Sequence, residues 1–555
     1  MPDDKYRQEL SARLDVLKEQ MAAGKIKFAA HLADGMRESL LRVRLAADGL
    51  VDMDTVDARV RSLANIVSHL KYREDTKSIA SLADIQDIYF GTIDRNFSRF
   101  FEQMLEANSN PHIVATVLSR NEEFLKDIEP QIDGFMDAIR EFWENIAQVV
   151  EIHAEDLSVM KAVFGGDLFP SHTKNIAGTC GLYVDTIVLP CPFIRIGPLY
   201  QTFPVPQKVY YVFKNALKLL EYKAVVLADV QPPIALVCPD KRLLQNSEDD
   251  FIRTFVDEDT AKHISLIFDR HFTSFGEALD FLRPLDTPEK VAEAAINPQY
   301  LLFDTDWSDS IPDQIARAMG EYGEATEMMS HGNPGLFVAH SIFGRMYQAN
   351  DLIDRSRSLR GTPLIDAPTS WQYLNWKLAK DNRFTTGASP DDTVTLHVVH
   401  ALQYAAERRL CWLGNVPMDT LISIRREGAA EEVRAILSKG VMDLAETDPE
   451  DFLGSTAQVI KNIDEAFERH NAMLRELRDG KLKIFGLDVL SCLAVGSIAV
   501  SAAVTANPLL GAVAGLSGIV GASNVKDIVK KIREIRSQER EVAASPTGLF
   551  FNHMR

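Results

Sequence analysis

The chain has 555 residues, of which 46% are hydrophobic and 25% charged, a composition that excludes collagen-like repeats and general disorder. At roughly 150 residues per domain, this length predicts about three or four domains. The 60 Lys and Arg against 79 Asp and Glu give a net charge of −19. Because so acidic a protein repels phosphate backbones, no nucleic-acid partner is expected.

The cysteines and the N-terminus indicate a reducing compartment. The five cysteines form no CxxC pair, and their number and sparse spacing fit buried free thiols rather than a disulfide framework; they are Cys180, Cys191, Cys238, Cys411 and Cys492. The first ten residues are polar and acidic, without the basic and apolar regions of a secretory signal. We therefore expect a cytoplasmic protein.

Residues 1–165 are expected to form an all-α domain. Apolar residues recur every three or four positions from Tyr6 to Met21 and from Val56 to Leu70, which predicts amphipathic helices. Further helices are predicted around residues 85–105, 112–125 and 132–152, with a break at Asn108–Pro111.

Residues 166–305 are expected to form a small α/β domain. Thr186–Leu189 and Ile234–Cys238 are short apolar runs that end at prolines, as buried strands do. A helix predicted over residues 206–230 lies between them, so the three segments form a candidate parallel βαβ unit. The apolar runs at 264–268 and 300–303 fit either further strands or buried helix.

Residues 306–483 are expected to form a helical domain. Ser310 before Pro312 and Asp313 is typical of a helix entry, and helices are predicted over residues 393–413, 418–426, 431–444 and 453–477. Residues 484–540 are expected to form an apolar hairpin with a basic amphipathic helix, and residues 541–555 a tail. The predicted fold is thus predominantly α, a multi-helix body with a small inserted α/β domain and a C-terminal helical hairpin.

The common local signatures of enzyme sites are missing from the sequence. There is no GxxxxGK[ST], GxGxxG, GxSxG or HExxH motif. No cofactor is therefore expected, and the sequence favours a protein that is not an enzyme.

Cys180 lies between His172 and Asp185, and these are the residue types of a thiol nucleophile site. A nucleophile and its base must lie in contact in the folded protein, and a separation of eight residues between His172 and Cys180 does not show this. A buried cysteine beside a strand is the favoured interpretation, with a catalytic thiol as the alternative.

Two acidic residues follow the apolar run at 300–303. Asp304 and Asp306 could share a divalent cation, because hard metals prefer several oxygen ligands. The favoured interpretation is an acidic loop at the start of the helix that Ser310 opens.

His397 and His400 are three residues apart on a predicted helix. Two imidazoles on one face are a known ligand set for transition metals. Leu396, Val398 and Val399 surround them, so packed core histidines are favoured and a metal site is the alternative.

The segment from Val489 to Val525 carries no charged side chain. Asn507 and Pro508 divide this segment, because proline disfavours helix at the residue before it. The sequence therefore predicts two helices joined by a turn at this point. Each spans about 27 Å, marginal for a hydrocarbon core of about 30 Å. The first contains Leu490, Leu493 and Ile498, and its lipophilic residues favour insertion by only about 2–4 kcal/mol.

The surroundings of this hairpin are also specific. Small residues at Gly511, Gly515 and Gly518 allow close helix contact. Basic residues follow it in an amphipathic pattern suited to an anionic membrane surface; they are Lys526, Lys530, Lys531, Arg533 and Arg536. An Ala- and Gly-rich hairpin among amphipathic helices resembles, in gross layout, the pore-forming domains of colicins, a likeness of composition that covers less than a tenth of the chain.

The sequence therefore favours a cytoplasmic helical protein whose hairpin associates conditionally with inner-membrane lipid, as a regulated membrane-perturbing effector. One alternative is a soluble enzyme with its site in the α/β domain. The other is a scaffold that self-associates, with the hairpin buried as core or at an interface.

Overall fold

The computed structural model describes residues 2–165, 176–245, 250–322, 330–365, 367–380, 394–402, 417–428, 430–447, 452–481, 483–484 and 487–488. These residues are mostly helical, with one small parallel sheet. The chain divides into two compact units. Unit 1 contains Met1–Ile88 and Phe142–Leu157, and unit 2 contains Tyr89–Glu141 and the described residues from Ser158 onward. The domain limits expected at 165, 305 and 483 stay predictions.

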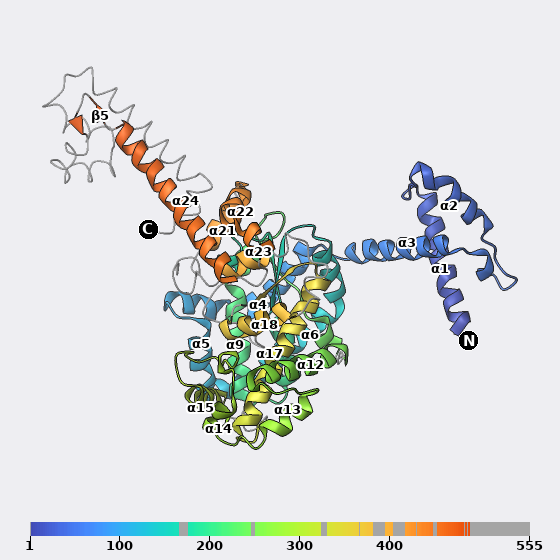
Figure 1. The fold of residues 1–555 in the computed structure, drawn as a ribbon. Helices are drawn as coiled ribbons and strands as arrows, with labels where there is room; N and C mark the ends of the chain where they lie inside the picture. Colours follow the sequence, from blue (N-terminus) through green and yellow to red (C-terminus); the bar gives the residue numbers. More distant parts are fainter. Residues whose placement is uncertain are drawn as a thin grey trace. The chain divides into compact units, whose positions relative to one another are not determined.

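Unit 1 is built from helices, as its sequence pattern predicts. They are α1 (Pro2–Ala22), α2 (Ala30–Arg42), the short η1 (Met53–Thr55), α3 (Ala58–Lys77), the first part of α4 (Leu82–Glu106) and the last part of α6 (Glu122–Asp156). Asp57 caps α3 by accepting a hydrogen bond from the amide of Val60. Leu10 of α1 and Val60 of α3 are buried in one apolar cluster, and α1, α2 and α3 pack together in Figure 1.

Ion pairs join the end of α3 to the end of α6 within unit 1. Arg73 contacts Glu155 and Asp156 at 2.6 Å each, and Lys77 contacts Asp156 at 2.5 Å. Asp156 is partly exposed, so these pairs fix the geometry of the unit more than they stabilise it.

Unit 2 contains a four-stranded parallel sheet in the order β3-β2-β1-β4. The strands are β1 (Lys161–Gly165), β2 (Thr186–Leu189), β3 (Ala235–Val237) and β4 (Thr362–Ile365). The chain moves from β1 outward to β2 and β3, then returns to the other side of β1 to form β4. The topological switch point therefore lies between β1 and β4. A two-stranded antiparallel ladder joins β5 (Lys483–Ile484) to β6 (Leu487–Asp488).

The predicted βαβ unit is confirmed, and the other two strands of the four-stranded sheet, β1 and β4, were not predicted. β2 and β3 are the runs expected from their apolar, proline-stopped pattern, and they pair in parallel. β1 lies in a region expected to be entirely helical. β4 contains Pro363, which removes a ladder donor, and it is tolerated because β4 is an edge strand that pairs only with β1.

The other helices of unit 2 precede or follow β4 in the chain. Those before β4 are α5 (Pro111–Ser119), α7 (Ile176–Cys180), α8 (Pro192–Tyr200), α9 (Val205–Leu220), α10 (Lys223–Val226), α11 (Lys241–Gln245), α12 (Asp250–Phe268), α13 (Phe275–Leu282), α14 (Pro288–Ala294), η2 (Pro298–Tyr300), α15 (Ile311–Tyr322) and α17 (Pro334–Ser358). Those after it are α18 (Pro368–Lys380), a helical segment at residues 394–402, α21 (Met418–Arg426), α22 (Ala430–Ser438), α23 (Val441–Thr447) and α24 (Phe452–Lys481).

One apolar core of unit 2 forms where α12 and α17 pack side by side (Figure 1). Ile264 and Ile267 are fully buried on α12, so the apolar run at 264–268 is helix and not strand. The run at 300–303 follows η2 without forming a strand. At the start of α17, a Cβ on Gly335 would lie 2.0 Å from the carbonyl oxygen of Leu282, so only glycine allows this approach.

The predicted C-terminal hairpin and its basic flank lie outside the described residues, as does His172. Within the described ranges, no helix combines the length and the apolarity that a bilayer crossing demands.

Candidate functional site

Charged side chains gather beyond the carboxyl ends of β2 and β3. Arg195 lies on α8, which follows β2, and Asp240 lies three residues after the end of β3. Arg242 is on α11, and α17 brings Asp351 and Arg355 against them. We call these five residues the carboxyl-edge cluster. The carboxyl ends of parallel strands are the usual place for a ligand site in open α/β sheets.

Local sequence fixes each part of this cluster. Pro192 starts α8 with a residue suited to the first turn, and Asp240 accepts a hydrogen bond from the amide of Arg242 at 3.0 Å. The last turns of α17 lie over the end of β1, where a Cβ on Gly165 would be 2.6 Å from Cδ1 of Leu352. Arg355 lies three residues further along α17, and its Nε faces Asp240 at 3.8 Å.

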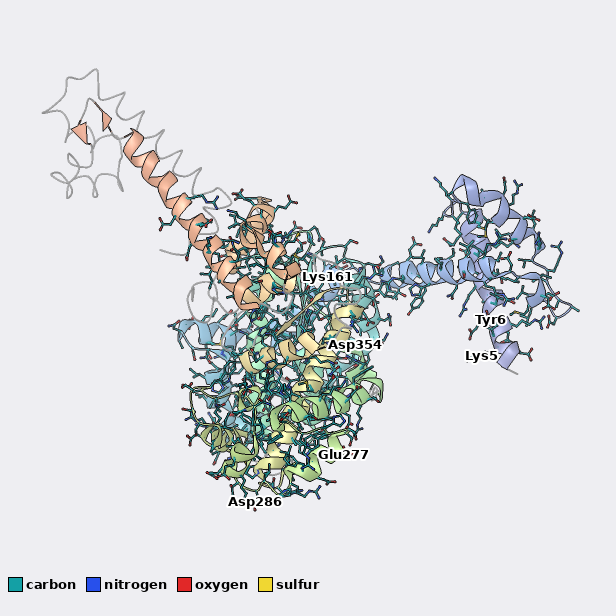
Figure 2. The ribbon with its side chains drawn as sticks, in the orientation of Figure 1. Lys5, Tyr6, Lys161, Glu277, Asp286 and Asp354 are labelled. Carbon is teal, nitrogen blue, oxygen red and sulfur yellow. The ribbon has the colours of Figure 1, made fainter. Side chains whose placement is uncertain are left out.

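Arg242 links the carboxylates of the cluster. One of its terminal nitrogens, Nη2, donates to Asp351, and the other, Nη1, donates at 3.1 Å to Asp354 of α17, whose exposed side chain is labelled in Figure 2. Its Nε lies 3.7 Å from Asp240. The guanidinium of Arg242 thus contacts the carboxylates of Asp351 and Asp354 on α17 and lies near that of Asp240, which precedes α11.

The two buried carboxyl groups differ in their affinity for a proton. Burial raises the pKa of Asp240, but the positive charges of Arg355, Arg242 and Arg195 outweigh it, so the net pKa is lowered. Burial and the charge of Asp240 instead raise the pKa of Asp351 above its usual value. Environments that move two carboxyl groups in opposite directions are typical of binding and catalytic sites.

Arg355 is only partly satisfied. Its residue is 7% exposed, and its Nε faces Asp240 at 3.8 Å, beyond hydrogen-bond distance. In the part of the chain that the structure describes, buried Nη1 and Nη2 have no hydrogen-bond acceptor. Because a guanidinium carries five donors and stays charged, these two unsatisfied donors are suited to hydrogen-bond an anion.

A second arginine–aspartate cluster lies at the opposite, amino edge of the sheet. Asp185 precedes β2 and accepts from the amide of Met160, which precedes β1, at 3.0 Å. Arg425 of α21 and Arg434 of α22 both donate to its Oδ1. We call Asp185, Arg425 and Arg434 the amino-edge cluster.

The donors of the amino-edge cluster also find backbone acceptors. Arg425 Nη2 donates to the carbonyls of Gly181, Val184 and Asp185, and Arg434 Nε donates to that of Tyr183 at 2.7 Å. Burial lowers the pKa of Arg425 despite the attraction of Asp185. This arrangement fastens two helices to the sheet and leaves these groups committed to structural contacts.

The structure describes two of the three residues of the candidate thiol site, Cys180 and Asp185. Cys180 is fully buried at the end of α7, and Asp185 belongs to the amino-edge cluster. His172 lies outside the described residues, so the catalytic interpretation stays a prediction.

The histidine pair is buried in the described helical segment 394–402. His397 Nδ1 lies 2.8 Å from the hydroxyl of Ser455 on α24, and His400 stacks on Trp371 with ring centroids 4.8 Å apart. Burial lowers the pKa of His400 to about 3, and His397 adds to that decrease. These contacts agree with packed core histidines.

The acidic loop after residue 303 is organised by its own neighbours. Asp304 pairs with Arg345 of α17, which also donates to Ser370. Asp306 accepts from the amide and hydroxyl of Ser308, which lower its pKa. Among the described residues, no group of three or more His, Cys, Asp or Glu side chains is arranged to hold a metal ion.

The carboxyl-edge cluster was not among the candidate sites predicted from the sequence. One signal was present, because Arg195 and Asp240 follow two runs expected to be neighbouring parallel strands, whose carboxyl ends meet at one edge. The contribution of α17, more than a hundred residues further along the chain, had no such signal.

Comparisons with known proteins add no relative: no family model, no curated protein and no solved structure matches the chain.

Proposed function

We propose that unit 2 is a ligand-binding α/β unit that holds a small anion at the carboxyl edge of its sheet, on the open Nη1–Nη2 edge of Arg355. A buried guanidinium without an acceptor on that edge, among the described residues, is the observation that carries the proposal. Its place beyond the carboxyl ends of parallel strands adds support. An Arg fork binds carboxylates and phosphates through two parallel hydrogen bonds.

Isothermal titration calorimetry with acetate, dimethyl phosphate and sulfate, at fixed ionic strength in chloride, tests this function. Saturable binding is expected for the native protein and its loss for Arg355→Met. Arg355→Lys, which keeps the charge but removes the fork, is expected to bind at least about tenfold more weakly, because the bidentate geometry is lost.

Arg357→Met is the matched control, because Arg357 is an exposed residue of the same helix. It should bind like the native protein. Circular dichroism checks that each variant is folded. Binding that persists unchanged in both Arg355 variants, or no saturable binding by the native protein, contradicts the proposal.

We also propose, from the sequence, that the C-terminal hairpin associates conditionally with inner-membrane lipid. The supporting observation is the uncharged stretch Val489–Val525, divided at Asn507-Pro508 and followed by basic residues. Flotation with anionic liposomes is expected to carry the full chain, and deletion of residues 484–525 to abolish this. Deletion of residues 541–555 is the control.

A stable truncation that stays soluble identifies an accessory membrane element. A truncation that fails to fold identifies a buried core and contradicts this second proposal, as does a full chain that ignores liposomes. Concentration-dependent light scattering of the full chain separates self-association from lipid binding.

A further inference from the structure

Asp240 presents a carboxylate oxygen next to the open guanidinium of Arg355. Its Oδ1 accepts a hydrogen bond from the amide of Arg242 at 3.0 Å. Its Oδ2 faces Nε of Arg355 at 3.8 Å, which is beyond hydrogen-bond distance. Because each carboxylate oxygen can accept about two hydrogen bonds, Oδ2 has the capacity to accept one from a ligand.

The donors and the acceptor lie together inside the protein. Asp240 is 5% exposed and Arg355 is 7% exposed. Nη1 and Nη2 of Arg355 have no acceptor among the described residues, and they belong to the same planar group as the Nε that faces Asp240. One small ligand can therefore reach both side chains.

The separation between Arg355 and Asp240 differs from that of a closed ion pair. At the amino edge, Nη1 of Arg425 donates to Oδ1 of Asp185 at 2.8 Å. Arg355 and Asp240 carry the same groups and are buried, but they stay 3.8 Å apart. Buried polar groups normally find partners, so this pair offers hydrogen bonds that the protein itself does not use.

We propose that the carboxyl-edge cluster binds a zwitterion of the α-amino-acid type. The carboxylate of the ligand accepts from Nη1 and Nη2 of Arg355, and its ammonium group donates to Oδ2 of Asp240. This rests on the proposed anion-binding function, because the carboxylate is the anion held by Arg355, and it names the ligand class.

The charges of such a ligand match the site at both ends. A zwitterion brings no net charge into the protein interior, and each of its charged groups meets an opposite charge with a hydrogen bond. A simple carboxylate leaves Oδ2 of Asp240 without a donor and places a second negative charge near it. A simple amine leaves Nη1 and Nη2 of Arg355 without an acceptor. Both lose one charged hydrogen bond relative to an amino acid.

Three small ligands of nearly equal size separate these cases on the native protein. Glycine carries both groups, propionate replaces the ammonium group by a methyl group, and glycinamide replaces the carboxylate by an amide. Isothermal titration calorimetry at pH 7, at fixed ionic strength in chloride, is expected to show glycine binding at least about tenfold more tightly than either analogue, as the loss of one charged hydrogen bond implies.

Substitution of the acceptor tests the role of Asp240. Asp240→Asn is expected to weaken glycine binding at least about tenfold and to leave propionate binding equal or tighter, because the negative charge near the carboxylate is gone. Asp354→Asn is the control, since that side chain is 53% exposed and pairs with Arg242; it should change both affinities by less than about twofold. Circular dichroism checks the folding of each variant, and the three-ligand comparison needs no variant.

Glycine that binds no more tightly than propionate to the native protein overturns this inference, as does an Asp240→Asn variant that weakens both ligands equally. In either case, propionate binding that is lost in Arg355→Met would leave the proposed anion-binding function standing. A native protein that binds neither glycine nor propionate contradicts the function itself.

Discussion

The two edges of the parallel sheet carry clusters of the same residue types with opposite consequences. At the amino edge, Arg425 and Arg434 close on Asp185 and on backbone carbonyls of the residues just before it. At the carboxyl edge, Arg355 is equally buried but faces Asp240 only at a distance. Counting buried ion pairs would rate the two edges alike. The difference lies in how completely each donor is satisfied, which separates a structural joint from a site that can receive a ligand.

The largest expected effect is at the amino edge. Arg425→Met leaves Asp185 with fewer donors and the carbonyls of Gly181 and Val184 without this partner. We expect the free energy of unfolding to fall by about 3–5 kcal/mol, as when one partner of a buried pair is removed. Urea denaturation measures this, and Arg426→Met, at an exposed neighbouring position, is the control. A loss below about 1 kcal/mol would remove the distinction between the edges.

A smaller decrease in the free energy of unfolding is expected for Arg242→Met at the carboxyl edge, because the side chain of Arg242 is 22% exposed. The variant loses charged hydrogen bonds to Asp351 and Asp354, which predicts a decrease of about 2 kcal/mol in the free energy of unfolding at pH 7. The decrease should shrink as the pH falls and Asp351 takes up a proton, because a neutral carboxyl group needs no cation. Urea denaturation between pH 4 and pH 7, with Lys241→Met as control, measures the size of the decrease and its dependence on pH. A decrease that is the same at every pH contradicts the interpretation that Arg242 stabilises the ionised carboxylate of Asp351.

Asp351 also predicts how stability depends on pH. Its pKa in the folded protein is raised above the ordinary 3.8, so the folded state binds more protons than the unfolded state between those two values. Stability therefore falls as pH rises through that window, and Asp351→Asn should remove a decline of about 1 kcal/mol for each pH unit that the window spans. Asp240 acts in the opposite sense, and only below 3.8. Thermal denaturation between pH 4 and pH 8 tests this, with Asp354→Asn as control; an unchanged slope in Asp351→Asn counts against it.

The smallest effect on stability is expected for Arg355→Met. Without an anion, the substitution removes one long contact to Asp240 and also removes the cost of burying an open guanidinium edge. The free energy of unfolding should change by about 0.5 kcal/mol or less. Urea denaturation in chloride beside Arg425→Met gives the direct comparison. A loss as large as that of Arg425→Met would show that Arg355 is a structural joint as well.

Local pattern predicts much of the helical structure. The helix at 418–426 matches α21, and the entry at Ser310 is followed by α15 from Ile311, because capping residues and apolar spacing act over a few residues. Prediction failed at β4, where Pro363 makes a strand look like a loop, and it left 264–268 open between strand and helix, of which the structure shows helix. Edge position and burial decided these two segments, and neither is a local property.

The sequence by itself determined the mostly helical class, the pairing of β2 with β3, and the unusual uncharged stretch Val489–Val525. Only the tertiary structure decided which charged residues meet. Asp185, an alternative candidate for a thiol site, belongs to the amino-edge cluster, and Arg355, which no motif marks, lies beside Asp240. The reason is physical: a charge is satisfied by whichever group folding brings within about 3 Å, and residues distant in sequence supply those groups at both edges of the sheet.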